Sequence, residues 1–228
     1  MKNIINYLSN KKIIIVVGHY GTGKTNISVN LSVKLKEQTG IVYTLVDLDT
    51  VNPYFRSADN IKDLKEHGID FIVPEYANTN VEVISVPAEI YSLFANNNNR
   101  RAILDVGGDD NGATVLGMFA DKIKLEDYEM IYVINKYRNL ISDVETAVNL
   151  AGFIERKSKL KITSVINNSN IGNLTTKKEI INSIEYAQNI SEFLNVPLLG
   201  TSSVTDLDFS EKKEYNIFGI KNYTKKLF

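Results

Sequence analysis

Residues 18–25 read Gly-His-Tyr-Gly-Thr-Gly-Lys-Thr, directly after an apolar run at 12–17 and at the start of a helix-like stretch at 24–38. A Gly-x-x-x-x-Gly-Lys-Thr segment between a strand and a helix is the context that a phosphate-binding loop requires. The glycines let successive backbone N–H groups turn toward one anion, and the helix N-terminus adds the positive end of its dipole. We therefore expect a Walker A loop here that binds the phosphates of a nucleoside triphosphate.

Two side chains of this loop have separate expected tasks. Lys24 would place its ammonium on the β- and γ-phosphates, and the Thr25 hydroxyl would bind Mg²⁺. The residues that we expect to contact the nucleotide in this part of the chain are Gly18, Gly21, Thr22, Gly23, Lys24, Thr25 and Asn26.

The rest of the chain alternates short runs rich in Ile and Val with longer amphipathic stretches. The runs are apolar at consecutive positions, which is typical of parallel strands buried on both faces. They lie at 12–17, 41–46, 69–73, 101–106, 130–134, 162–166 and 196–199. The helix-like stretches lie at 24–38, 58–66, 87–94, 113–123, 142–156 and 176–194. This alternation predicts a three-layer α/β fold with a doubly wound, mostly parallel sheet, as in P-loop NTPases, and a single nucleotide-binding domain over 1–228.

Charge and composition exclude several classes of function. The 26 basic and 27 acidic residues nearly cancel, so we expect no nucleic acid partner bound through bulk charge. The chain has no cysteine, which excludes thiolate catalysis and Cys-ligated metal sites. No apolar run reaches the roughly 18 residues of a membrane span, so we expect a cytoplasmic protein. The C-terminal stretch 208–228 carries only a weak membrane signal, and we favour a packed element there, such as a closing helix, over a partner-binding tail.

Acidic residues follow two of the expected strands. Asp47 and Asp49 come after the run 41–46, and the carboxyl ends of parallel strands are where ligands bind in such sheets. Asp49 is the candidate for orienting an attacking water, and the alternative for either residue is to cap the next turn. Asp105 ends the run 101–106 as a Walker B carboxylate would. The predicted Mg²⁺ ligands are Thr25, Asp47, Asp49 and Asp105.

Two further residues have predicted roles near the γ-phosphate. Gly108 completes an Asp-x-x-Gly pattern, and its N–H could contact the γ-phosphate and report its loss. Arg56 could bring a positive charge to the transition state, in cis or in trans, or could be an ordinary surface arginine. The predicted catalytic set is Lys24, Asp49, Gly108 and Arg56.

Asn167 and Asn168 follow the run 162–166 and are the candidates for recognising the base. An amide offers both a donor and an acceptor to a purine edge, although an Asn pair also forms turns. Guanine specificity usually needs an Asn-Lys-x-Asp loop. Residues 135–138 begin this way but end in Arg138, and they follow an earlier strand than expected. We therefore predict ATP rather than GTP.

The order of these motifs resembles the MinD/ParA/CobQ-type ATPases of the SIMIBI class of P-loop NTPases. Residues 18–25, 46–56, 105–110 and 165–168 are similar, more narrowly, to a small bacterial group of ATP-binding proteins described by analogy to cobyrinic acid a,c-diamide synthase. The similarity spans nearly the whole chain. It implies a Mg²⁺-dependent ATP-binding protein and a slow ATPase (an ATP hydrolase) that acts as a conformational switch.

The chain departs from these relatives in one position. MinD and ParA relatives carry a lysine directly after the first glycine of the loop, and it reaches the nucleotide of a partner subunit. Here that residue is His19, which is no dependable cation at neutral pH, so a homodimer closed by ATP is left open. Two alternative functions also stay open: a phosphotransferase or ATP-dependent ligase of the dethiobiotin synthetase type, and a non-hydrolysing docking module. The sequence names neither a protein partner nor a small-molecule substrate.

Overall fold

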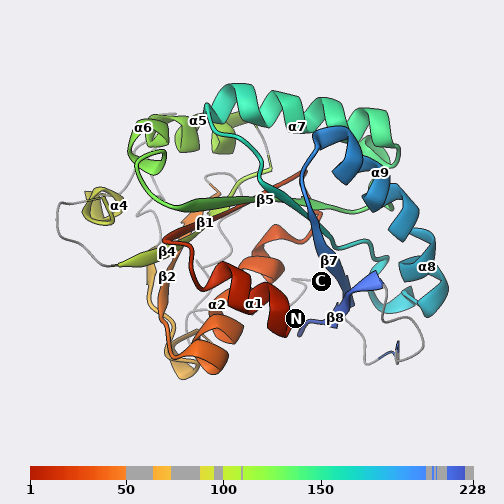
Figure 1. Ribbon diagram of the computed structural model, residues 1–228, viewed down its shortest axis with the longest axis horizontal. Helices are drawn as coiled ribbons and strands as arrows, with labels where there is room; N and C mark the ends of the chain where they lie inside the picture. The colour runs from red at the N-terminus through yellow and green to blue at the C-terminus, as the bar shows by residue number, and fades with distance from the viewer. Residues whose placement is uncertain are drawn as a thin grey trace, which may run out of the picture.

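A parallel β-sheet forms the centre of the molecule (Figure 1). The computed structural model describes residues 1–49, 64–72, 88–94, 100–108, 110–203, 207, 209 and 215–223. Within these residues, eight strands pair in the order β3-β2-β4-β1-β5-β6-β7-β8, and every neighbouring pair is parallel. The strands are β1 Ile13–Val17, β2 Tyr43–Leu48, β3 Phe71–Ile72, β4 Arg101–Val106, β5 Tyr128–Ile134, β6 Ser164–Asn167, β7 Leu198–Ser203 and β8 Ile217–Gly219.

Helices cover both faces of the sheet, and the predicted three-layer α/β fold is confirmed (Figure 1). The helices are α1 Lys2–Leu8, α2 Lys24–Thr39, α4 Ala88–Ser92, α5 Asp110–Met118, α6 Ala120–Ile123, α7 Val144–Ser158, α8 Lys177–Asn182 and α9 Ile184–Leu194, with short 3-10 turns at Asn139–Ile141 and Gly172–Leu174. α1 and α2 pack on one face, and α4, α5, α6, α7 and α9 pack on the other. No helix in the described part of the chain is long and apolar enough to cross a membrane.

The central strand shows why the runs are apolar at consecutive positions. Ile13, Ile15 and Val17 of β1 belong to the core under α5 and α7, whereas Ile14 and Val16 belong to the core under α2. All five residues are buried. Because side chains alternate along a strand, a strand between two helical layers must be apolar on both faces.

The observed elements differ from the predicted ones at several positions; α1 has no counterpart among the predicted helices, and the stretch 113–123 is divided into α5 and α6. β2 begins at Tyr43 and ends at Leu48, so Asp47 lies inside the strand and not after it. The stretch predicted as one helix at 176–194 is divided at Ser183 into α8 and α9. In the described part of the C-terminal stretch, Ile217–Gly219 forms the strand β8 beside β7, and Phe218 and Ile220 are buried, so this part is packed, as we favoured.

The strand order predicts a ligand-binding crevice at the carboxyl ends of the central strands. β1 lies between β4 and β5. Strands β2, β3 and β4 lie on one side of β1, and strands β5 to β8 lie on the other side. Ligands bind at the carboxyl ends of the strands where this order reverses. The loops that follow β1, β4, β5 and β6 therefore meet there.

Candidate functional site

The loop at 18–25, called the P-loop below, can form only with glycine at its ends. Gly18 has a φ of +150°, and a Cβ atom added to it would lie 2.3 Å from the Val133 carbonyl oxygen of β5. Gly23 has a φ of +86° and precedes the first residue of α2. Both residues have backbone conformations that residues with a side chain rarely adopt. This explains why the first and last positions of the motif are glycine.

The carbonyl group of His19 organises the inside of the P-loop. It accepts hydrogen bonds from the Thr22 backbone N–H at 3.3 Å and the Thr22 hydroxyl at 2.9 Å. It also accepts one from the Lys24 ammonium at 3.1 Å. Lys24 is only 7% exposed, so its charge is held within the loop. The His19 ring itself lies with Nδ1 2.9 Å from the Tyr20 carbonyl oxygen.

Asp105 brings a buried carboxylate to the first turns of α2. It is 1% exposed, and its Oδ1 accepts a hydrogen bond from the Ser28 hydroxyl at 3.2 Å. Its Oδ2 is buried with no hydrogen-bond partner among the described residues. Burial raises the pKa of the Asp105 carboxyl to about 6, although the nearby Thr25 hydroxyl and Lys24 ammonium favour the charged form. A buried oxygen without a partner is the acceptor that a cation or its water would satisfy.

Asp47 and Asp49 occupy different environments. Asp47 is fully buried and is the register partner of Asp105 on the neighbouring strand, so the two side chains face the same side of the sheet. The Asp49 backbone N–H donates to Asp47 Oδ1 at 2.9 Å, which is the turn-capping role weighed as an alternative for these residues. The Asp49 carboxylate is close enough to raise the pKa of Asp105.

The donor set fits Mg²⁺ only if the nucleotide and water complete the coordination. No group of three or more His, Asp or Glu residues in the described ranges could hold a metal ion by itself. Mg²⁺ in phosphate-transfer sites keeps several waters and binds one or two carboxylates together with phosphate oxygens. Asp105 Oδ2, which has no hydrogen-bond partner among the described residues, and the nearby Thr25 hydroxyl would supply such a small number of protein ligands.

Gly108 touches the P-loop directly. A Cβ atom on Gly108 would lie 2.5 Å from the Tyr20 backbone nitrogen and 2.9 Å from the His19 carbonyl carbon. Position 108 therefore has to be glycine, because the segment after β4 comes very close to the P-loop backbone there. The spacing of the Asp-x-x-Gly pattern places the predicted γ-phosphate sensor against the phosphate loop.

Asn167, the last residue of β6, and Asn168, directly after it, have structural roles that sequence reasoning missed. Asn167 is fully buried, and its amide donates to Ser183 Oγ at 2.8 Å and accepts from Ser169. Asn168 donates to the Thr22 carbonyl oxygen at 2.6 Å and accepts from the Ser202 hydroxyl. Asn168 thus ties the loop after β6 to the P-loop. Contact of either amide with a base stays a prediction.

Other predicted site residues are placed elsewhere or fall outside the described residues. The Asn26 side-chain oxygen accepts from the Tyr223 backbone N–H at 2.9 Å, so it holds the C-terminal segment against α2. Arg56, and with it the stretch 52–56, lies outside the described residues. The structure also brings Arg138 to the P-loop, where no role was assigned to it: a Cβ atom on Gly21 would lie 3.2 Å from its guanidinium carbon.

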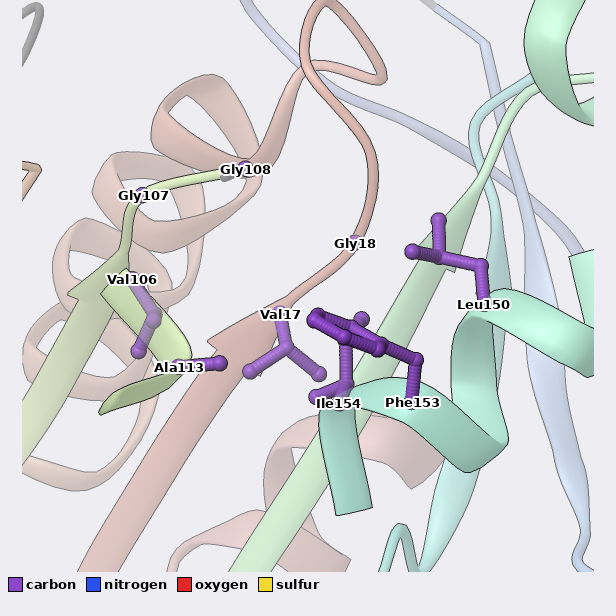
Figure 2. Close-up of a pocket in the computed structure, with 9 residues that line it drawn as sticks. All are labelled: Val17, Gly18, Val106, Gly107, Gly108, Ala113, Leu150, Phe153 and Ile154. Atoms are coloured by element: carbon purple, nitrogen blue, oxygen red, sulfur yellow. The ribbon is translucent and has the colours of Figure 1, made fainter. Parts of the chain in front are cut away.

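A small apolar pocket lies behind the P-loop, between the sheet and α7 (Figure 2). Its volume is about 20 Å³, which is room for about one water molecule. Its walls come from the ends of β1 and β4, the segment after β4, α5 and α7; the lining residues are Val17, Gly18, Val106, Gly107, Gly108, Ala113, Leu150, Phe153 and Ile154. The side chains that reach into it are all apolar, so the described lining residues bring polar atoms to it only through their backbone.

Comparison with known proteins identifies the fold. No protein-family model and no curated protein matches the sequence. The 54 kDa protein of the signal recognition particle from Aeropyrum pernix K1, in complex with GDP, has a TM-score of 0.54 at 19% identity, and the match covers 88% of this chain and 46% of that one. A nucleotide-binding protein from Archaeoglobus fulgidus in complex with ADP has a TM-score of 0.49 at 12% identity, over 95% and 90% of the two chains. The first likeness confirms a P-loop NTPase fold, and this chain spans less than half of that protein.

Proposed function

We propose that this chain binds ATP together with Mg²⁺ and hydrolyses it slowly, as a conformational switch. One observation carries the proposal. The Lys24 ammonium inside the P-loop and Oδ2 of Asp105, which has no hydrogen-bond partner among the described residues, both lie at the first turns of α2. A cation, a helix N-terminus and a buried carboxylate oxygen with no partner together suit a phosphate–metal pair.

Each residue would do a separate part of the work. Lys24 would leave the His19 carbonyl for the β- and γ-phosphate oxygens, where its charge is better balanced. Thr25 and Asp105 would hold Mg²⁺, which supplies further neutralisation of the phosphate charge. Asp49, which is partly exposed beside Asp105, would orient the water that attacks the γ-phosphate. Catalysis of this kind is positioning and electrostatics, which suits a slow switch.

The switch function rests on the contacts of the segment after β4. Gly108 lies against Tyr20 of the P-loop, and Gly112 of α5 lies so near Gly107 that a Cβ atom would be 2.5 Å from the Gly107 carbonyl oxygen. Gly117 brings α5 close to α7, where a Cβ atom on Gly117 would lie 2.6 Å from the Lys157 carbonyl oxygen. A displacement of Gly108 on loss of the γ-phosphate would therefore move α5 against α7.

The pocket beside this segment also favours a switch over a phosphotransferase or ligase for small carboxylates. Such an enzyme needs polar groups next to the γ-phosphate to hold its second substrate. Among the described residues, the lining of the pocket between Gly18, Gly108 and α7 has no polar side chain that would bind a carboxylate.

Titration of the purified protein tests nucleotide binding. In the presence of Mg²⁺ we expect ATP to bind at least about tenfold more tightly than GTP, a difference of about 1.4 kcal/mol. The physical reason is that residues 135–138 lack the carboxylate that would accept the guanine N–H groups. Chelation of Mg²⁺ should weaken ATP binding. Equal or tighter binding of GTP would contradict the base assignment, and no binding of either would contradict the proposed function.

Gly108→Ala tests the coupling of the segment after β4 to the P-loop. We expect ATP hydrolysis to fall by about ten- to a hundredfold, because the new Cβ atom would push the segment away from the Tyr20 backbone and misplace its N–H by a fraction of an ångström. Single-turnover hydrolysis with excess protein measures the effect. The matched control is Gly219→Ala in β8, since a Cβ atom there meets nothing within 4 Å. Unchanged hydrolysis in Gly108→Ala would exclude Gly108 as a sensor.

A further inference from the structure

Arg138 approaches the P-loop from the loop that follows β5. A Cβ atom built on Gly21 would lie 3.2 Å from both Cζ and Nε of Arg138, and 3.5 Å from one terminal nitrogen. The guanidinium therefore lies flat against the outer edge of the P-loop. Gly21 also has a φ of +74°, so this point of the loop needs glycine for its backbone and for the space that Arg138 occupies.

The segment that carries Arg138 is held in place by buried hydrogen bonds. Asn135 is fully buried, accepts from the backbone N–H groups of Tyr137 at 3.0 Å and Asn170 at 3.3 Å, and donates to the Asn170 carbonyl oxygen at 3.2 Å. The Lys136 backbone N–H donates to the Ser169 hydroxyl at 2.8 Å. These bonds fix the turn, and the Arg138 N–H closes it on the Asn135 carbonyl oxygen at 3.1 Å. Arg138 is thus presented from a preorganised turn.

The charge of Arg138 is not neutralised by an acidic side chain in the part of the chain that the structure describes. None of the ion pairs between described residues includes Arg138, and the residue is exposed. Lys24 lies inside the P-loop and Arg138 lies outside it, so two cations border one loop of backbone N–H groups. A guanidinium presents several donors in one plane, which matches the oxygens of a phosphate chain.

We propose that Arg138 binds the β- and γ-phosphates of the nucleotide in cis, as the second cation of the site. The inference rests on the proposed function, because it needs a triphosphate in the P-loop. It assigns a binding role to residues 135–138, whose sequence only begins like a guanine-recognition motif. It also gives the site a second cation from this chain, besides the Lys24 ammonium.

Affinities of Arg138 variants for ATP and ADP test this proposal. We expect Arg138→Ala to weaken Mg²⁺-dependent ATP binding by about tenfold, the size of one charge-assisted hydrogen bond to a partly exposed site. The loss for ADP should be smaller, because one of the two bound phosphates is missing. Arg138→Lys should recover part of the ATP affinity, since it restores the charge but not the planar donors.

The control is Arg156→Ala, which removes the same charge from an exposed position near the end of α7. It should leave both affinities unchanged, and urea unfolding should show that Arg138→Ala is as stable as the wild type. Unchanged ATP affinity in Arg138→Ala, or equal losses for ATP and ADP, would overturn the role of Arg138 while the wild type still binds ATP. Failure of the wild type itself to bind ATP would overturn the proposed function as well.

Discussion

Lys24→Ala should lower the affinity for ATP by at least about a hundredfold and abolish measurable hydrolysis. Lys24 is 7% exposed, and its ammonium is held within the P-loop by the His19 carbonyl at 3.1 Å. Its replacement removes the charge that would meet the β- and γ-phosphates in a site with little water. A hydrogen bond to a charged group contributes roughly 1.5–3 kcal/mol, and a triphosphate would accept more than one from this ammonium. Isothermal titration with ATP and Mg²⁺ measures the loss.

The fold of this variant should survive, which makes the binding result interpretable. The His19 carbonyl, which accepts from the Lys24 ammonium, also accepts from the hydroxyl and the backbone N–H of Thr22, so it keeps hydrogen-bond donors when Lys24 is replaced. Lys34→Ala serves as the control, because it lies on the same helix and its ammonium pairs with Glu37 at the surface. Its ATP affinity should match that of the wild type. Wild-type affinity in Lys24→Ala would show that the P-loop does not hold the phosphates.

Parts of the site could be predicted because they depend on short stretches of sequence. The P-loop residues 18–25 and Asp105 each follow an apolar run, so strand ends and loop chemistry can be recognised locally. The tie between Asn168 and Thr22 and the approach of Arg138 could not be predicted. They depend on which loops become neighbours when β1, β5 and β6 pair in the sheet. Residue types alone carry no information on that order.

The misplaced end of β2 has a physical cause of the same kind. A carboxylate is rarely buried inside an apolar strand, so the sequence pattern predicts that the strand ends before Asp47. In the structure, Asp47 continues the ladder as the register partner of Asp105 and accepts the Asp49 N–H. The strand tolerates the buried carboxylate because Asp47 lies near the carboxyl end of β2, where the loops meet. A departure from the burial rule at this end of the sheet is what a functional site produces.

Asp105→Asn should raise the stability of the nucleotide-free protein while it removes Mg²⁺-dependent hydrolysis. Burial raises the pKa of Asp105 from its ordinary value of 3.8 to about 6, so the folded state keeps a proton that the unfolded state releases. The unfolding free energy of the wild type should therefore fall as the pH rises from about 4 to about 6 and stay lower above it. Asparagine keeps an acceptor for the Ser28 hydroxyl and carries no charge.

Urea unfolding from pH 4 to pH 8 measures this difference. We expect Asp105→Asn to be about 3 kcal/mol more stable than the wild type above pH 6, since the pKa rises from 3.8 to about 6 and one pKa unit corresponds to about 1.4 kcal/mol, and equally stable near pH 4. Asp121→Asn in α6 is the control, because that exposed carboxyl should leave the pH profile of the unfolding free energy unchanged. Hydrolysis with Mg²⁺ should fall by about a hundredfold in Asp105→Asn alone. Lower stability of this variant at pH 7 would show that Lys24 and Thr25 already compensate the charge in the free protein, so that the Asp105 carboxylate stabilises the fold without a metal ion.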